Sequence, residues 1–262
     1  MADFPLSLNN INSLTAVDYD GSKNYRLLAT KGKGDIYLYS ENGKKLNAWF
    51  PKKTNTSLIG SPKHIRIGSN DFFLAIEKKG TINLLRRNGK QANGFPIKTG
   101  KTLQETYNYE KGSKLSNSFI RVLTKKGEYI KVTFHGKVSR QDLLKNNSSN
   151  ESVEMVSNAS HTDYVYLYRK GKNFTIKDRF LKTIYTTELN ITSSAKKELY
   201  TFNNSKYVSV FNKRSQKAII NNLSSLSERR ITSSTPVDIY RQGNRLFVAS
   251  SNEHQIILKT YQ

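Results

Sequence analysis

Basic residues recur in this sequence at one kind of position, a predicted turn between two apolar strands. Equivalent turns of a repeat protein lie on one face, so these residues would form a broken ring of cations that attracts an acidic polysaccharide, a nucleic acid or an anionic lipid surface. Lysine is also a common turn residue, and other lysines would decorate the opposite face, so a purely solubilising role stays open. The candidate anion-binding residues are Lys31, Lys33, Lys78, Lys79, Lys125, Lys126, Arg169, Lys170, Lys213 and Arg214.

Two carboxylates at alternate positions, Asp18 and Asp20, open a segment that reads Asp-Tyr-Asp-Gly-Ser. Carboxylate oxygens with this spacing suit a hard cation, and the segment resembles the opening of a calcium loop of the FG-GAP type. The third acidic position holds Ser22, and no other repeat carries the motif. The second interpretation is a strand that ends in an Asp-Gly hairpin turn.

A catalytic site would have to be assembled from scattered side chains. The sequence has no cysteine and no motif of a nucleophile elbow, a phosphate loop or a zinc protease, and none of its four histidines has a second histidine at metal-ligand spacing. We therefore expect no catalytic residue and no cofactor. The alternative is a propeller hydrolase or lyase that brings carboxylates from the first strands toward a central channel. Its candidates are Asp18, Glu105, Glu154, Glu198 and Asp238, which equally fit solvent-facing strand positions.

An internal repeat positions all of these residues. Segments 34–54 and 80–100 both begin with Gly, alternate polar and apolar residues, turn at Asn-Gly-Lys and carry Phe-Pro near the end. The repeat weakens along the chain, but each unit keeps an apolar strand that follows an alternating strand and a polar turn. These apolar strands are residues 25–30, 72–77, 119–124, 164–169, 207–212 and 246–251. The pattern predicts an all-β fold, a six-bladed β-propeller of four-stranded antiparallel blades.

The predicted organisation is a single propeller domain over residues 1–262. The last unit ends after three strands, while Phe4-Pro5-Leu6 at the N-terminus is similar to the Phe-Pro segments of the first two units. We therefore expect the N-terminal strand to complete the last blade and close the ring, because an outer edge strand tolerates proline. The expected blades are approximately residues 10–54, 60–100, 101–147, 151–191, 195–232, and 235–262 with 3–8.

The composition indicates more about the partners of the protein than about its activity. The formal net charge is +23, and the excess is spread through both halves of the chain, which favours anionic partners in general. No apolar run is long enough to span a membrane, and the N-terminus lacks the basic and apolar regions of a signal peptide. We expect a monomer, and the lack of cysteine leaves the compartment open.

The pattern Gly-x-Ile-x-Leu, followed by Gly-Lys and then Phe-Pro, in residues 34–51 and 80–96 resembles repeats of bacterial propellers of the PQQ-like and FG-GAP (VCBS) group. The resemblance implies a propeller module of a larger bacterial envelope or secreted protein, in the periplasm or at the cell surface. Trp49 is the only tryptophan, so the docking signature of quinoprotein blades is absent and no quinone is implied. The expected function is a non-enzymatic binding scaffold for a protein or an anionic polymer.

Overall fold

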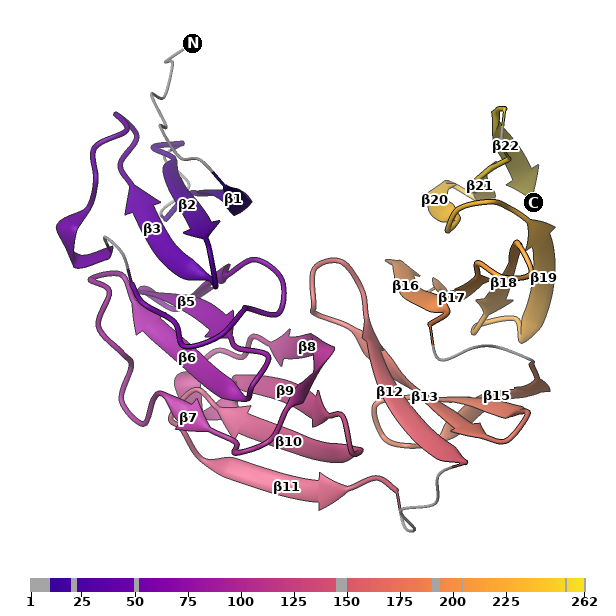
Figure 1. Ribbon diagram of the computed structural model, residues 1–262, viewed down its shortest axis with the longest axis horizontal. Helices are drawn as coiled ribbons and strands as arrows, with labels where there is room; N and C mark the ends of the chain where they lie inside the picture. The colour runs from indigo at the N-terminus through magenta and orange to yellow at the C-terminus, as the bar shows by residue number, and fades with distance from the viewer. Residues whose placement is uncertain are drawn as a thin grey trace. The chain divides into compact units, whose positions relative to one another are not determined.

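The computed structural model describes residues 10–19, 23–49, 52–144, 150–189, 194–203, 205–252 and 254–261. These residues form β-strands joined by turns, with two single-turn 3-10 helices at Asn47–Trp49 (η1) and Leu115–Asn117 (η2). The strands build six antiparallel sheets of three or four strands each, in which neighbours in the chain are neighbours in the sheet (Figure 1). No helix within the described ranges is long and apolar enough to cross a membrane. The all-β prediction is confirmed, while the closed ring of six blades remains a prediction.

The chain divides into two compact units, Met1–Asp142 and Leu143–Gln262, here called the N-terminal and C-terminal units. Each contains three of the six sheets. The sheets of the N-terminal unit are Ile11–Val17 (β1), Arg26–Lys31 (β2) and Asp35–Tyr39 (β3); Lys63–Ile67 (β4), Asn70–Ile76 (β5), Thr81–Arg86 (β6) and Ile97–Lys98 (β7); and Leu103–Glu110 (β8), Phe119–Thr124 (β9), Glu128–Thr133 (β10) and Val138–Asp142 (β11).

The sheets of the C-terminal unit repeat the same order. They are Glu151–Ser157 (β12), Tyr164–Lys170 (β13), Asn173–Lys177 (β14) and Thr183–Glu188 (β15); Lys196–Phe202 (β16), Ser205–Asn212 (β17), Lys217–Asn222 (β18) and Ser227–Thr232 (β19); and Asp238–Gln242 (β20), Arg245–Ser251 (β21) and Ile256–Tyr261 (β22).

The second strand of a sheet is the apolar strand that the sequence predicts, and β5 shows why it is apolar throughout. Phe72, Leu74 and Ile76 belong to a core shared with the β8–β11 sheet. Phe73 and Ala75 point the other way, into a core shared with the β1–β3 sheet. Because side chains alternate along a strand, a sheet packed on both faces requires an unbroken apolar run.

The same arrangement recurs in the C-terminal unit at β17. Val208 and Val210 contribute to a core with the β12–β15 sheet, whereas Tyr207 and Phe211 contribute to a core with the β20–β22 sheet. In each unit, therefore, three sheets are stacked face to face in chain order. Face-to-face stacking of consecutive four-stranded units is the packing of propeller blades.

Two sheets have three strands among the described residues instead of the four expected. After β3 the chain makes only isolated bridges, Tyr39 with Lys45 and Ile36 with Lys52, because it turns through η1 to bury Trp49. Trp49 packs edge-on against Phe73, with the ring centroids 4.8 Å apart. The segment expected to complete the last sheet, residues 3–8, lies outside the described residues.

The predicted Phe-Pro strand also differs in detail. In the second sheet Phe95 and Pro96 directly precede the short outer strand β7 and are not part of its ladder. Phe95 is buried in the core with the third sheet, and Pro96 has no N–H group to donate to a neighbouring strand. The corresponding Phe50 and Pro51 lie outside the described residues.

Candidate functional site

The turns that follow β2 and β5 both contact the segment that connects their two sheets. Gly34 packs so closely on this connector that a Cβ atom there would lie 2.9 Å from Cγ of Leu58. The next turn contacts the same connector, because the Lys78 N–H donates a hydrogen bond to the carbonyl of Ser57 over 2.8 Å. Both turns therefore lie at one end of the N-terminal unit.

The third turn, after β9, continues this arrangement. The Leu103 N–H donates to the carbonyl of Lys78 over 2.9 Å, and the Lys125 N–H donates to the carbonyl of Thr102 over 3.0 Å. Turns and connectors thus alternate along one end of the unit. We call the turns 31–34, 77–80 and 124–127 the turn row.

A buried carboxylate holds the middle of the turn row. Glu77 is 2% exposed, and its Oε2 accepts the backbone N–H groups of Asn55 and Thr56 over 3.0 and 2.9 Å. Its Oε1 accepts the side-chain amide of Asn83 over 3.1 Å. Glu77 therefore joins the connector to the turn.

The lysines of the turn row differ in their partners. Lys78 forms an ion pair with Glu105, with Nζ 2.7 Å from Oε1. The hydrogen bond and charge of Lys78, with a smaller effect of Lys125, hold the pKa of Glu105 below its usual value. Lys31 is the half-buried last residue of β2. Four lysines are exposed and form no ion pair within the described part of the chain; these unpaired lysines are Lys33, Lys79, Lys125 and Lys126.

The predicted basic residues of the C-terminal unit also lie where the second strand meets the third. Arg169 is half-buried in β13, and Lys170 at the end of β13 pairs with Glu151 over 2.8 Å. Lys213 and Arg214 are exposed in the turn between β17 and β18. The ring of cations across five blades would include residues of both units and remains a prediction.

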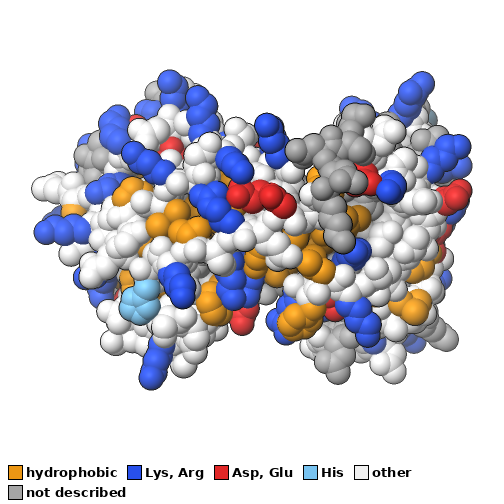
Figure 2. Space-filling view, turned by 90° about the horizontal axis from the view of Figure 1, so that it is seen from below, with side chains coloured by type: hydrophobic (Ala, Val, Ile, Leu, Met, Phe, Trp, Pro, Cys, Tyr) orange, Lys and Arg blue, Asp and Glu red, His pale blue; other side chains and the backbone are white. Residues whose placement is uncertain are grey.

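Basic side chains are not confined to these turns. Figure 2 shows lysine and arginine side chains spread over the whole visible face, with acidic side chains in small groups. Lys44, Lys45, Lys90 and Lys137 are exposed in turns that follow the third strands of their sheets. Antiparallel strands place those turns at the end of the unit opposite the turn row. Charge alone therefore does not mark the site, and the turn row is distinguished by the backbone hydrogen bonds that join its turns to the connectors.

The carboxylates considered for an enzyme are mostly held by lysine. The ion pairs are Glu105 with Lys78, Glu154 with Lys197 over 2.9 Å, and Glu198 with Lys196 over 2.9 Å. Asp238 is exposed at the start of β20. Nearby cations stabilise the charged form of a carboxylate, the opposite of what a general acid requires. An enzymatic role stays untested.

The candidate calcium ligands lie just after β1. Oδ2 of Asp18 accepts the backbone N–H of Lys23 over 3.1 Å, which fits the turn interpretation of this segment. Asp20 and Ser22 lie outside the described residues, so calcium binding is untested. The described residues contain no group of three or more His, Asp or Glu side chains that could hold a metal ion.

The histidines occupy separate positions. Nε2 of His64 lies 2.8 Å from Oδ1 of the buried Asp71. His161 and His254 lie in bends outside the strands. His135 lines a cavity of about 490 Å³ between the second and third sheets of the N-terminal unit.

That cavity was not predicted from the sequence, although the repeat contains a signal for it. Arg86 and Arg87 line the cavity, and they stand where the first repeat has Ser40 and Glu41. A pair of cations that appears in one copy of a repeat and not in the other is a departure that points to a local role.

No protein-family model and no curated protein matches this chain. Solved structures do. BBS1N in complex with ARL6DN is 15% identical, with a TM-score of 0.54 over 90% of this chain and 73% of that one. The β-propeller domain of Cps50 (Swd1) from Myceliophteria thermophila is 12% identical, with a TM-score of 0.53 over 95% of this chain and 85% of that one.

The dihydro-heme d1 dehydrogenase NirN in complex with DHE is 9% identical, with a TM-score of 0.55 over 95% of this chain and 54% of that one. These likenesses support a fold of the β-propeller kind. At such low sequence identity the likenesses concern the fold alone, and they do not single out the PQQ-like or FG-GAP group.

Proposed function

We propose that this protein is a six-bladed β-propeller that acts as a non-enzymatic binding module and binds an anionic polymer through the turn row. The observation that carries the proposal is the set of four unpaired lysines on turns joined by backbone hydrogen bonds. Cations on turns whose backbones are joined by hydrogen bonds attract a chain of phosphates, sulfates or carboxylates.

The structural likenesses agree with a binding role. BBS1N is a protein whose structure was solved in complex with ARL6DN. We extend a binding role, without a named partner, to this chain, as a module of a larger bacterial envelope or secreted protein. The exposed lysines favour recognition of the charge of a polymer, because no aromatic side chain for base stacking lies in the three turns.

The dependence of affinity on salt tests the proposed function. Titration of the protein into a labelled oligothymidylate and into a heparin fragment, followed by fluorescence anisotropy, should give affinities that fall steeply with salt. Each phosphate that a lysine neutralises in a single strand contributes a log–log slope of about −0.7, so four unpaired lysines predict roughly −3. A slope near zero with both polymers would remove the basis of the proposal.

Closure of the ring by the N-terminus is part of the proposed architecture. The last sheet has three strands in the described residues, and Ile256 and Leu258 of β22 are exposed. Deletion of residues 1–9 should lower the melting temperature by several degrees, because it removes the strand and the apolar contacts expected from Phe4 and Leu6. Melting followed by circular dichroism checks this, and an unchanged curve would mean that the segment closes no blade.

A further inference from the structure

The cavity lies at the end of the N-terminal unit opposite the turn row. It is lined by the turn between β4 and β5, the hairpins that follow β6 and β10, and η2 between β8 and β9. In an antiparallel sheet these connections all lie at one end, and the turns between second and third strands lie at the other. The cavity is therefore a separate site from the one that carries the proposed function.

The two hairpins that wall the cavity are held together by a close approach of their backbones. A Cβ atom on Gly136 would lie 2.7 Å from the carbonyl oxygen of Gly94, and one on Gly94 would lie 2.6 Å from that of His135. Both glycines have positive φ angles, +80° and +85°. No other residue fits at this contact, so the cavity is built into the packing of the second sheet on the third.

The floor of the cavity is apolar. Phe72 of β5 and Phe134 after β10 meet edge to face, with ring centroids 6.1 Å apart, and both are buried. A volume of about 490 Å³ is within the range of sites for small ligands. An aliphatic or aromatic stem could cover this floor.

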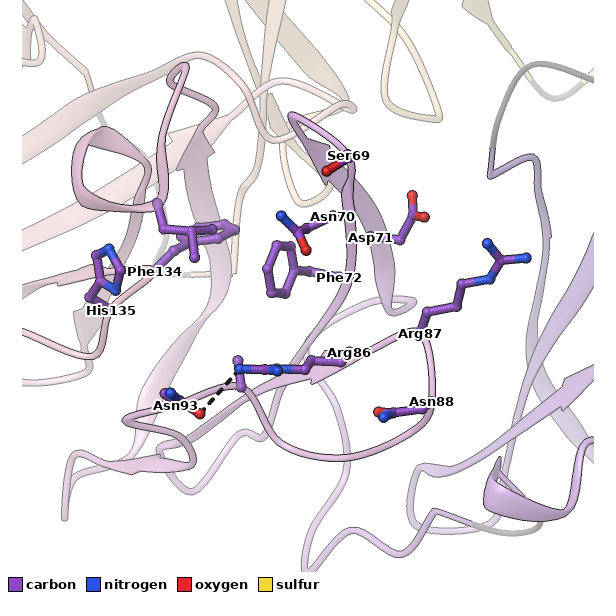
Figure 3. A pocket seen from close by; sticks show the side chains of 12 residues that line it. Ser69, Asn70, Asp71, Phe72, Arg86, Arg87, Asn88, Asn93, Phe134 and His135 are labelled. Carbon is purple, nitrogen blue, oxygen red and sulfur yellow. Dashed lines mark hydrogen bonds between the residues drawn. The ribbon is translucent and has the colours of Figure 1, made fainter.

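Arg86 and the amides of Asn88 and Asn93 form one wall of the cavity, whereas the Arg87 side chain points away from Arg86 (Figure 3). Arg86 is exposed and uses one N–H group to bind Oδ1 of Asn93 over 3.1 Å, which fixes the guanidinium and leaves further donors for a ligand. The guanidinium of Arg87 lies over the ring of Tyr19, 4.3 Å from its centroid. The Arg87 backbone is fixed as well, because its carbonyl accepts the indole N–H of Trp49 over 3.0 Å.

The one carboxylate in the lining does not neutralise these arginines. Oδ1 of Asp71 lies 2.8 Å from Nε2 of His64 and 3.9 Å from Nη1 of Arg66. Asp71 thus interacts with His64 and Arg66, which do not line the cavity, but its negative charge still repels an anion inside the cavity. The lining still has two arginines against this one carboxylate, so its net charge attracts an anion.

We propose that this cavity binds a carboxylate carried on an apolar stem, with the carboxylate at Arg86 and the stem on Phe72 and Phe134. Two sources present this chemistry, an acidic side chain beside an apolar one in a partner peptide, and a free aliphatic acid. The peptide N-acetyl-Leu-Glu-amide represents the first source and hexanoate represents the second.

Titration followed by amide shifts in ¹H–¹⁵N spectra of the full chain tests the proposal. Each carboxylate probe should shift the amides of residues 86–93 and 134–136. The neutral analogue N-acetyl-Leu-Gln-amide should bind at least about tenfold more weakly than the glutamate peptide, because it loses the charge-assisted hydrogen bonds. Tighter binding of the peptide assigns the source to a protein partner, and tighter binding of hexanoate assigns it to a free acid.

A matched pair of variants removes one positive charge each from the same hairpin. Arg86→Gln should weaken the carboxylate probes about tenfold, since it removes the donor in the wall. Lys90→Gln should change the affinity less than about twofold, because Lys90 is exposed and is not part of the lining. The proposal is overturned if both variants lose binding equally, if the glutamate and glutamine peptides bind alike, or if neither carboxylate shifts these amides at millimolar concentration.

Discussion

Replacement of the four unpaired lysines Lys33, Lys79, Lys125 and Lys126 by glutamate is expected to weaken binding of heparin and oligothymidylate by more than about a hundredfold. Each change removes an attraction and adds a repulsion, and all four act on the same stretch of polymer. The fold should persist, because exposed turn lysines without ion pairs contribute little to stability. Fluorescence anisotropy at one fixed salt concentration gives the affinities.

The control is a second fourfold reversal with the same change in net charge. Lys44, Lys45, Lys90 and Lys137 are exposed at the other end of the N-terminal unit, and their replacement by glutamate should weaken binding several-fold only. If both variants lost binding equally, the polymer would be responding to net charge, and the turn row would not be a site.

Glu77→Ala should lower the free energy of unfolding by about 3 kcal/mol. The change removes the buried carboxylate that accepts the backbone N–H groups of Asn55 and Thr56, and each hydrogen bond to a charged group contributes about 1.5–3 kcal/mol. Urea denaturation followed by circular dichroism measures the loss.

Glu105→Ala is the control for Glu77, because Glu105 is an exposed carboxylate paired with a lysine of the same turn. Removal of a surface ion pair should cost no more than about 1 kcal/mol. Equal losses for the two variants would contradict the role of Glu77 as the residue that joins the turn to the connector.

Most of the strand order could be predicted from the sequence, because a strand that is buried on both faces has an uninterrupted run of apolar residues. The six runs predicted from that rhythm all fall on second strands, from β2 to β21. The outer strands are harder to predict from the sequence, since they are short and half-exposed. Phe95 reads as part of a strand in the repeat, but it leaves the ladder to fill the core beneath it.

Only part of the site could be predicted, because its contacts join residues that are far apart in the sequence. The positions of Lys78 and Lys79 follow from the repeat alone, but the sequence does not distinguish Lys78, which is paired, from Lys79, which is not. The partner of Lys78 is Glu105, on the first strand of the next sheet. The role of Glu77 was missed because its acceptor bonds join it to residues about twenty positions earlier.

A footprint of the bound polymer tests the central claim most directly. Hydrogen–deuterium exchange of the full chain, with and without a heparin fragment at low salt, reports which backbone segments are protected. We expect protection at residues 31–34, 77–80 and 124–127 and no change in the turns that hold Lys44, Lys90 and Lys137. Protection at those opposite turns, with the turn row unchanged, would contradict the central claim.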